Sequence, residues 1–327
     1  MRLALFSLAL AAVAGFAPVA KAMPSGERVW LESYLAFPIE NVPFTASAMG
    51  YLGPVKEVAA TFDIRDARGA LATSRQTVAT FYPDGRAAEE TDTDLLAHQI
   101  VFRAVYRYNQ RNQIAEIARN DYAAGTAELI DFTYDKNGFL VGATMRNDGR
   151  IEKLVTIVNS PGGKPLEVEN RLADGREISR LAYRYDDASV RIAYTAAGGA
   201  EQVISVFTLD AQGRPVTAAT ERRDTASMVD YDGTYRYTYL ADGEKLFHGV
   251  EDHIHAQPRA TRCVIDREFF KNGGVRHAES VGDDITCRDR PAPDPEVAFD
   301  AEGNFTQSRL GPYEHIYAIT YYSAASM

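Results

Sequence analysis

The sequence predicts an all-β protein in which antiparallel hairpin repeats form a large twisted or curled sheet, or a two-sheet sandwich, with a short N-terminal helix. Three observations support this fold class. Apolar and polar residues alternate with period two from Val55 onward, glycine-containing turns recur between the alternating segments, and one segment alone outside the leader has a helical period. With strands of five to eight residues, we expect about 14–18 strands.

Residues 1–22 read as a cleavable signal peptide. Arg2 precedes an apolar run that extends from Leu3 to Ala20, and Ala20-Lys21-Ala22 supplies the small residues that signal peptidase requires. A transmembrane anchor is the alternative, but the run is marginal for a span of about 20 apolar residues and no basic cluster follows it. We therefore expect cleavage after Ala22 and a periplasmic or secreted protein that does not span a membrane.

Residues 23–50 should form a helix followed by a loop. Ser25 can cap a helix over residues 24–36. The apolar side chains on one face of that helix follow the spacing i, i+1, i+4, i+5 and are Trp30, Leu31, Tyr34 and Leu35. We expect this face to cover one side of the sheet.

Strand-like alternation continues from residue 51 to residue 327, which we predict to be a single β domain. In residues 100–108, one face carries apolar side chains and the other carries Arg103 and Arg107. The apolar set is Ile100, Phe102, Ala104, Tyr106 and Tyr108. Residues 234–239 and 313–321 show the same alternation, which is typical of half-buried strands in an antiparallel sheet.

A turn with Asp-Gly, Asn-Gly or Asp-x-x-Gly recurs eight times between these segments. Glycine supplies the positive φ that tight hairpin turns require, so each copy predicts a hairpin. The copies lie at residues 82–86, 134–138, 147–150, 173–176, 209–214, 241–244, 270–273 and 299–304. A Pro-rich link at 291–295 separates the last hairpin and strand from the rest.

The repeated pattern, an aromatic residue followed by Asp-x-x-Gly, a polar residue and a strand, resembles the YD repeat of the RHS family. Tyr134-Asp135-Lys136-Asn137-Gly138 is one example, and Gly53-Pro54-Val55-Lys56-Glu57-Val58 resembles the opening of secreted bacterial proteins with degenerate repeats of this kind. The resemblance covers roughly residues 51–310. It implies a hairpin-repeat fold; the toxin-enclosing role of large RHS proteins is not implied, because this chain is too short for such a shell.

Charge and cysteine content narrow the possible functions. Without Arg2 and Lys21 of the leader, 33 basic and 45 acidic residues remain, a net charge of −12 that disfavours nucleic-acid binding. The two cysteines, Cys263 and Cys287, are predicted to form a disulfide, with free thiols or half of a metal site as alternatives.

A histidine-rich segment is the strongest candidate for a metal site. In a strand, His253 and His255 would face one side at a spacing that suits zinc or copper, with His248 or Asp252 as further ligands. Surface histidines on a polar strand are the alternative, and we expect no cofactor as the default. The acidic run from Glu89 to Asp94 is better explained as a charged strand than as a calcium loop.

Tyrosines that alternate with arginines form the remaining candidate surface. They could stack on sugar rings or dock a protein, although core packing explains most of them. The candidate set is Tyr106, Tyr108, Tyr235, Tyr237 and Tyr239. Because no catalytic motif is present, we expect a non-enzymatic binding or scaffold protein whose partner is a protein or glycan of the bacterial cell envelope. An exported metal-dependent hydrolase that uses the His248–His255 region is the alternative.

Overall fold

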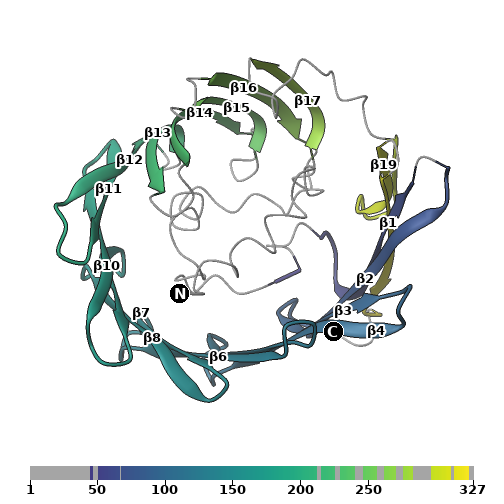
Figure 1. Cartoon of the computed structure of the whole chain (residues 1–327), viewed down its shortest axis with the longest axis horizontal. Coiled ribbons are helices and arrows are strands. Elements are labelled where there is room, and N and C mark those ends of the chain that lie inside the picture. Colours follow the sequence, from purple (N-terminus) through teal and green to yellow (C-terminus); the bar gives the residue numbers. More distant parts are fainter. Residues whose placement is uncertain are drawn as a thin grey trace. The chain divides into compact units, whose positions relative to one another are not determined.

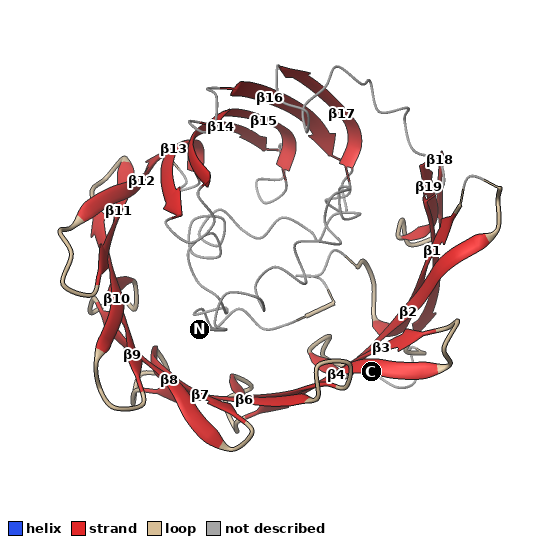
Figure 2. Ribbon diagram, in the orientation of Figure 1, coloured by secondary structure: helices blue, strands red, loops and turns tan. Residues whose placement is uncertain are grey.

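The all-β prediction is confirmed by the computed structural model. It describes residues 45–46, 51–66, 68–211, 215–224, 229–239, 246–255, 261–269, 275–282, 296–310 and 313–323. The regular elements in these ranges are strands, and no helix occurs among them (Figure 2). Accordingly, none of the described segments is a helix that could cross a membrane. The predicted leader, the helix over 24–36 and the Pro-rich link at 291–295 lie outside the described residues.

The chain divides into two compact units, and the larger comprises Glu40–Leu181, Thr195–Gly199 and Pro295–Met327. Its strands are β1 (Val55–Arg65), β2 (Leu71–Phe81), β3 (Ala87–Asp94), β4 (Gln99–Tyr108), β5 (Ile114–Asp121), β6 (Thr126–Tyr134), β7 (Leu140–Asn147), β8 (Arg150–Asn159), β9 (Pro165–Leu172), β18 (Glu296–Phe299), β19 (Phe305–Leu310) and β20 (Tyr313–Tyr321).

Each strand of the larger unit pairs antiparallel with its sequence neighbour from β1 to β9, and β1, β2 and β3 can be followed in this order in Figure 1. The C-terminal strands β18, β19 and β20 continue this sheet on the other side of β1. The register there aligns Phe62 with His315 and Ala60 with Tyr317. The first and last strands of the unit are therefore direct neighbours.

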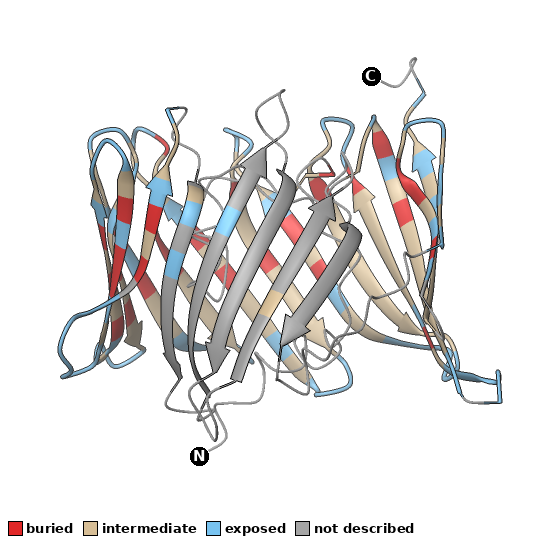
Figure 3. Ribbon diagram, turned by 90° about the horizontal axis from the view of Figure 1, so that it is seen from above, coloured by how far each residue is buried: buried red, intermediate tan, exposed pale blue. Residues whose placement is uncertain are grey.

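The sheet of the larger unit has two unlike faces. Buried positions recur along the strands between more exposed ones, as Figure 3 shows. We call the buried side the apolar face; its members include Ala104, Tyr106, Ile117, Ile130, Phe132, Ala143, Val155, Ile157 and Val168. In β4 the opposite side carries the exposed Arg103 and Arg107, as the period-two pattern predicts.

Two of the predicted turns share one set of hydrogen bonds. Between β6 and β7, an Asp135 carboxylate oxygen accepts the amides of Asn137 (2.9 Å) and Phe139 (2.8 Å). Gly138 lies at φ +90°, in the left-handed region that glycine adopts at little energetic penalty. The Asp300 carboxylate accepts the amides of Glu302 and Asn304 in the same way. Each of the eight predicted turns falls between two strands that are consecutive in the sequence.

Some hairpin turns have no glycine and were not predicted. One of them joins β4 to β5, where the Asn109 side chain accepts the amides of Arg111 (2.8 Å) and Gln113 (3.1 Å). Asn112 takes the left-handed conformation at φ +62°. Turns of this kind are one reason why the described residues contain 20 strands, more than the expected 14–18.

The smaller unit contains Ala182–Tyr194 and Ala200–Asp294. Its strands β11 (Ser189–Ala196), β12 (Gln202–Leu209), β13 (Pro215–Asp224), β14 (Val229–Tyr239), β15 (Leu246–His255), β16 (Thr261–Phe269) and β17 (Val275–Gly282) pair antiparallel in sequence order. β10 (Glu177–Tyr185) includes residues of both units. A register shift between Ile192 and Ala193 ends the alternation in β11, so Ala193 is buried and Tyr194 is exposed.

Candidate functional site

The predicted site residues of the smaller unit lie on two adjacent pairs of strands. His248, Asp252, His253 and His255 belong to β15, and Tyr235, Tyr237 and Tyr239 belong to the neighbouring β14. Cys263 lies in β16, which pairs with β15, whereas Cys287 lies outside the described residues. The disulfide therefore remains a prediction.

The two predicted site tyrosines of the larger unit are packed against other residues. Tyr106 is 5% exposed and its hydroxyl donates to a Glu90 carboxylate oxygen at 3.2 Å. Tyr108 is half-buried, its hydroxyl donates to the carbonyl of Ala87, and its ring centroid lies 4.5 Å from the Arg86 guanidinium carbon. Burial raises the pKa of both phenols. These contacts hold the β2–β3 turn against β4.

A different group of aromatic side chains is gathered by the pairing of β20 with β1. We call Phe62, Tyr313, His315 and Tyr317 the aromatic patch; all four are half-buried. The Phe62 ring centroid lies 4.6 Å from that of His315 and 6.3 Å from that of Tyr313, with Phe62 and Tyr313 nearly parallel at 4°. His315 and Tyr317 are also close to parallel, at 6.2 Å and 14°.

Polar groups of β2 and β3 border the aromatic patch. Arg75 is aligned with Phe62, and Thr77 is aligned with both Ala60 and Asp92. The Thr77 hydroxyl donates to the Asp92 carboxylate at 2.5 Å. Burial raises the pKa of Asp92, while the Thr77 hydrogen bond and the positive charge of Arg75 act in the opposite direction. The exposed Arg75 is therefore directly opposite Phe62, and the partly desolvated Asp92 carboxylate lies one strand further from the rings, on β3.

Tyr51, which precedes β1, extends the aromatic surface toward β3. Its ring packs against Phe81 in an edge-to-face arrangement at 6.2 Å. Burial, together with the negative charge of Glu90, raises the pKa of Tyr51 to about 12. Burial also raises the pKa of Tyr317, with a smaller contribution from Tyr51, and lowers the pKa of His315, which favours the neutral imidazole. The rings of the patch are therefore neutral, and the charged group nearest to Tyr51 is the Glu90 carboxylate on β3.

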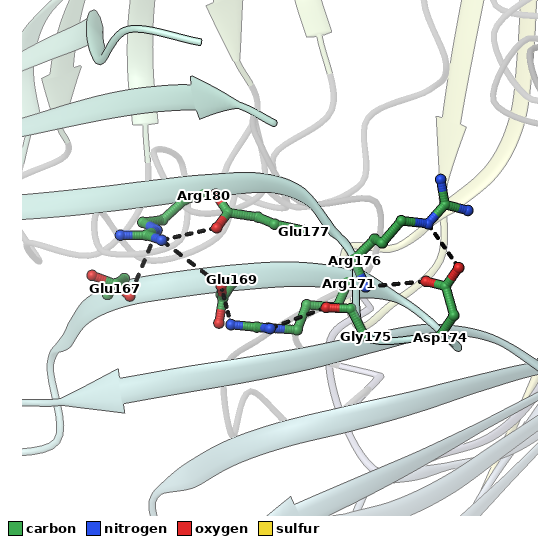
Figure 4. A network of polar contacts seen from close by, with 8 residues as sticks. All are labelled: Glu167, Glu169, Arg171, Asp174, Gly175, Arg176, Glu177 and Arg180. Atoms are coloured by element: carbon green, nitrogen blue, oxygen red, sulfur yellow. Dashed lines mark hydrogen bonds and ion pairs between the residues drawn. The ribbon is translucent and has the colours of Figure 1, made fainter. Parts of the chain in front are cut away.

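The opposite face of the sheet carries ion pairs. In the group drawn in Figure 4, Arg180 contacts Glu177 at 2.9 Å and lies 3.8 Å from Glu169, which also pairs with Arg171 at 2.6 Å. Further along the sheet, Arg103 binds Glu89 through two nitrogen–oxygen contacts. These side chains are partly exposed, as expected for a face that contacts water.

None of the patch residues was among the candidate site residues that the sequence predicted. The alternation along residues 313–321 predicted only that Tyr313, His315 and Tyr317 share a face, and the ring contacts confirm it. Phe62, Arg75 and Asp92 were missed as site residues, because they join the patch only through strand pairing. The useful signal was the alternation along residues 313–321, which predicted a strand but not that β1 is its partner.

Other features of the described residues offer less chemistry. A shallow depression of about 530 Å³ lies at the β7–β8 turn and is lined by Asn147, Asp148, Arg150, Ile151 and Glu152. Where the structure describes side chains, no three His, Cys, Asp or Glu are arranged to hold a metal ion, and His253, His255 and Cys263 are not among those side chains.

Comparison with known proteins gives weak structural similarity. No protein-family model matches the chain, and no curated protein sequence matches it. A porin-like protein from Bacteroides uniformis aligns with 82% of this chain and 98% of its own, at 11% identity and a TM-score of 0.36. The Tc holotoxin pore of Photorhabdus luminescens aligns with 76% of this chain at 10% identity and a TM-score of 0.26, and a TcdB2–TccC3 structure aligns with 78% at 11% and 0.28. This chain covers 17% and 18% of those two chains, and similarity at this level assigns neither a family nor an activity.

Proposed function

We propose that this chain is an exported, non-enzymatic binding protein that holds a neutral glycan of the cell envelope on its aromatic patch. The observation that carries the proposal is the row of half-buried rings at Phe62, Tyr313, His315 and Tyr317. Arg75 is directly opposite Phe62 on β2, and Asp92 lies one strand further away, on β3. Export follows from the leader that the sequence predicts.

The chemistry of the patch matches that of a sugar. A pyranose ring has an apolar C–H face, which packs against aromatic rings, and hydroxyl groups, which need donors and acceptors at the rim. Arg75 supplies donors opposite Phe62, and Asp92 supplies an acceptor on the strand beyond it. The side chains come from paired strands, so the sheet holds them in place before a ligand binds.

Charge favours a neutral glycan over an anionic one. The mature chain has a net charge of −12, and the carboxylates of Glu90 and Asp92 lie on β3, close to the patch. An anionic polysaccharide would be repelled at low ionic strength. A protein partner is the competing occupant, and the experiment below distinguishes the two.

The repeated turns supply the scaffold for this surface. We propose that they are degenerate YD-type repeats, since the Asp carboxylate accepts the same two amides at Asp135 and at Asp300. Each hairpin extends the sheet without adding a new layer. Such an arrangement favours a broad binding surface over an enclosed catalytic pocket.

The test is binding of the purified mature protein to a panel of neutral and acidic envelope polysaccharides, measured by calorimetry. We expect binding to a neutral glycan that the Tyr317→Ala and Asp92→Asn variants weaken by about tenfold or more, which corresponds to roughly 1.4 kcal/mol. Tyr122→Ala is the matched control, because Tyr122 is 50% exposed and lies in the turn between β5 and β6.

Two results would contradict the proposal. One is glycan binding that Tyr122→Ala reduces as much as Tyr317→Ala. The other is the absence of glycan binding together with capture of an envelope protein that depends on Tyr317, which would make the patch a protein-docking surface.

A further inference from the structure

Phe102 lies between two carboxylates on the face of the sheet that carries the aromatic patch. It is half-buried in β4, with Asp92 of β3 directly opposite on one side and Asp121 of β5 directly opposite on the other. Directly opposed positions in an antiparallel pair share a face, with Cβ atoms about 4.5–5.5 Å apart. The aromatic ring of Phe102 is therefore flanked by a carboxylate on each neighbouring strand.

One cross-strand row connects Phe102 to the aromatic patch. Tyr317 of β20 is opposite Ala60, Ala60 is opposite Thr77, and Thr77 is opposite Asp92. Four strand spacings therefore separate Tyr317 from Phe102, which at about 4.8 Å each is roughly 19 Å. Because Ala60 and Thr77 are small, no bulky side chain of this row separates the two aromatic positions.

Each carboxylate beside Phe102 has one oxygen held by the protein. An Asp92 oxygen accepts the Thr77 hydroxyl at 2.5 Å, and an Asp121 oxygen accepts the Ala124 amide at 2.8 Å. Among the residues that the structure describes, the second oxygen of each group makes no hydrogen bond. These bonds restrain both side chains and leave one acceptor oxygen of each for a ligand hydroxyl.

We propose that Phe102, Asp92 and Asp121 form a second sugar subsite, so that the protein binds a linear neutral oligosaccharide along the row from Tyr317 to Asp121. The Phe102 ring offers a surface for the apolar C–H face of a sugar, and the two carboxylates accept its hydroxyl groups. This inference rests on the proposed function and specifies the length of its ligand.

The spacing of the two subsites sets the size of the ligand. A separation of roughly 19 Å exceeds the reach of a disaccharide, so only a chain of several linked sugar rings contacts both the patch and Phe102. Once one end of such a chain is bound at the patch, binding of its other end becomes intramolecular, which raises the affinity. Affinity should therefore increase with the length of the oligosaccharide.

The test is calorimetric titration of the full mature protein with disaccharide, tetrasaccharide and octasaccharide fragments of neutral glucan, mannan and galactan. We expect an octasaccharide to bind at least about tenfold more tightly than the disaccharide of the same polymer. Phe102→Leu keeps an apolar side chain without the ring, so it should abolish this advantage and leave disaccharide affinity unchanged. Phe102→Tyr keeps a ring and should preserve the advantage. Asp121→Asn replaces an acceptor oxygen with an amide group and should reduce it.

Phe139→Leu and Glu116→Gln are the matched controls. Phe139 is half-buried in the turn between β6 and β7, and Glu116 lies on β5 opposite Arg107, on the other face of the sheet. Neither substitution should change the dependence of affinity on length, and far-UV circular dichroism verifies that each variant is folded.

The outcomes separate this inference from the proposed function. Equal affinities for disaccharide and octasaccharide, both weakened by Tyr317→Ala, would overturn the second subsite and leave glycan binding at the aromatic patch intact. A length advantage that Phe139→Leu reduces as much as Phe102→Leu would also overturn it. The absence of binding to every fragment and to the parent polysaccharides would overturn the proposed function and this inference together.

Discussion

Asn304 holds the backbone of Leu52 by two hydrogen bonds across 252 residues of sequence. Its amide nitrogen donates to the Leu52 carbonyl at 2.8 Å, and its amide oxygen accepts the Leu52 amide at 2.6 Å. Asn304 is 1% exposed, and it also donates to the Tyr321 hydroxyl, which in turn donates to Asp300. The turn between β18 and β19 is thereby attached to the segment that leads into β1.

Replacing Asn304 with alanine should destabilise the larger unit. Two backbone groups of Leu52 would lose their partners in a buried setting, and each such loss costs about 1–3 kcal/mol, so we expect about 2–4 kcal/mol in total. Chemical denaturation measures this change. Asn137→Ala is the control, because Asn137 is exposed in the corresponding turn between β6 and β7. Equal losses of unfolding free energy in the two variants would show that the contact with Leu52 adds no stability beyond that of an exposed turn residue.

The contact between Asn304 and Leu52 could not be predicted from the sequence, because it depends on which distant strands pair. Alternation along residues 313–321 correctly predicted which side chains of β20 share a face. Nothing local specifies that β20 pairs with β1, since a strand's partner depends on pairing energies summed over the whole sheet. The aromatic patch needs that pairing, and therefore Phe62 and Asp92 were not recognised as site residues.

Turn chemistry was predicted where glycine marks it and missed where asparagine replaces it. Gly138 and Gly303 both have positive φ and lie in predicted turns. Asn112 adopts the same backbone region, which asparagine tolerates better than most residues, but its surrounding sequence lacks the Asp-Gly pattern.

The carboxylate of Asp135 should contribute measurably to the β6–β7 turn. Alanine at this position leaves the amides of Asn137 and Phe139 without their side-chain acceptor, so we expect a loss of about 1 kcal/mol, comparable to the loss of a helix N-cap. Lys136→Ala in the same turn is the control and should have little effect. Thermal unfolding compares the variants. A loss of stability in Lys136→Ala as large as that in Asp135→Ala would contradict this role.

Gly142 should not tolerate a side chain. It lies inside β7, and a Cβ added there would be 2.7 Å from the carbonyl oxygen of Val155 in the paired strand β8. Because a backbone oxygen cannot move without disturbing the ladder, Gly142→Ala should destabilise the protein by about 1–3 kcal/mol. The nearby substitution Thr144→Ala removes atoms on the same strand and should be milder. Urea denaturation measures the stability of both variants. A Gly142→Ala protein as stable as the parent would refute the predicted clash between the added Cβ and the Val155 carbonyl oxygen.

Asp92 should make stability depend on pH in a direction unusual for a carboxylate. Its folded-state pKa is raised by burial above the unfolded value of about 3.9. Between the two pKa values the folded state binds more protons than the unfolded state, so the free energy of unfolding falls as pH rises through that window. Asp92→Asn removes the charge and keeps an oxygen that can accept the Thr77 hydroxyl. We therefore expect this variant to unfold at a higher temperature at pH 7, by about 2–4 °C, and to lose that advantage near pH 3.

The comparison with Asp94→Asn makes this prediction specific to Asp92. Asp94 lies on the same strand and accepts the amides of Leu96 and Ala97, so its neutralisation should not stabilise the protein. A gain in both variants would indicate a general effect of negative charge, and no gain in either would contradict the burial of Asp92. If Asp92→Asn raises the unfolding temperature while it weakens glycan binding, then the carboxylate is retained at the expense of stability because the ligand needs it.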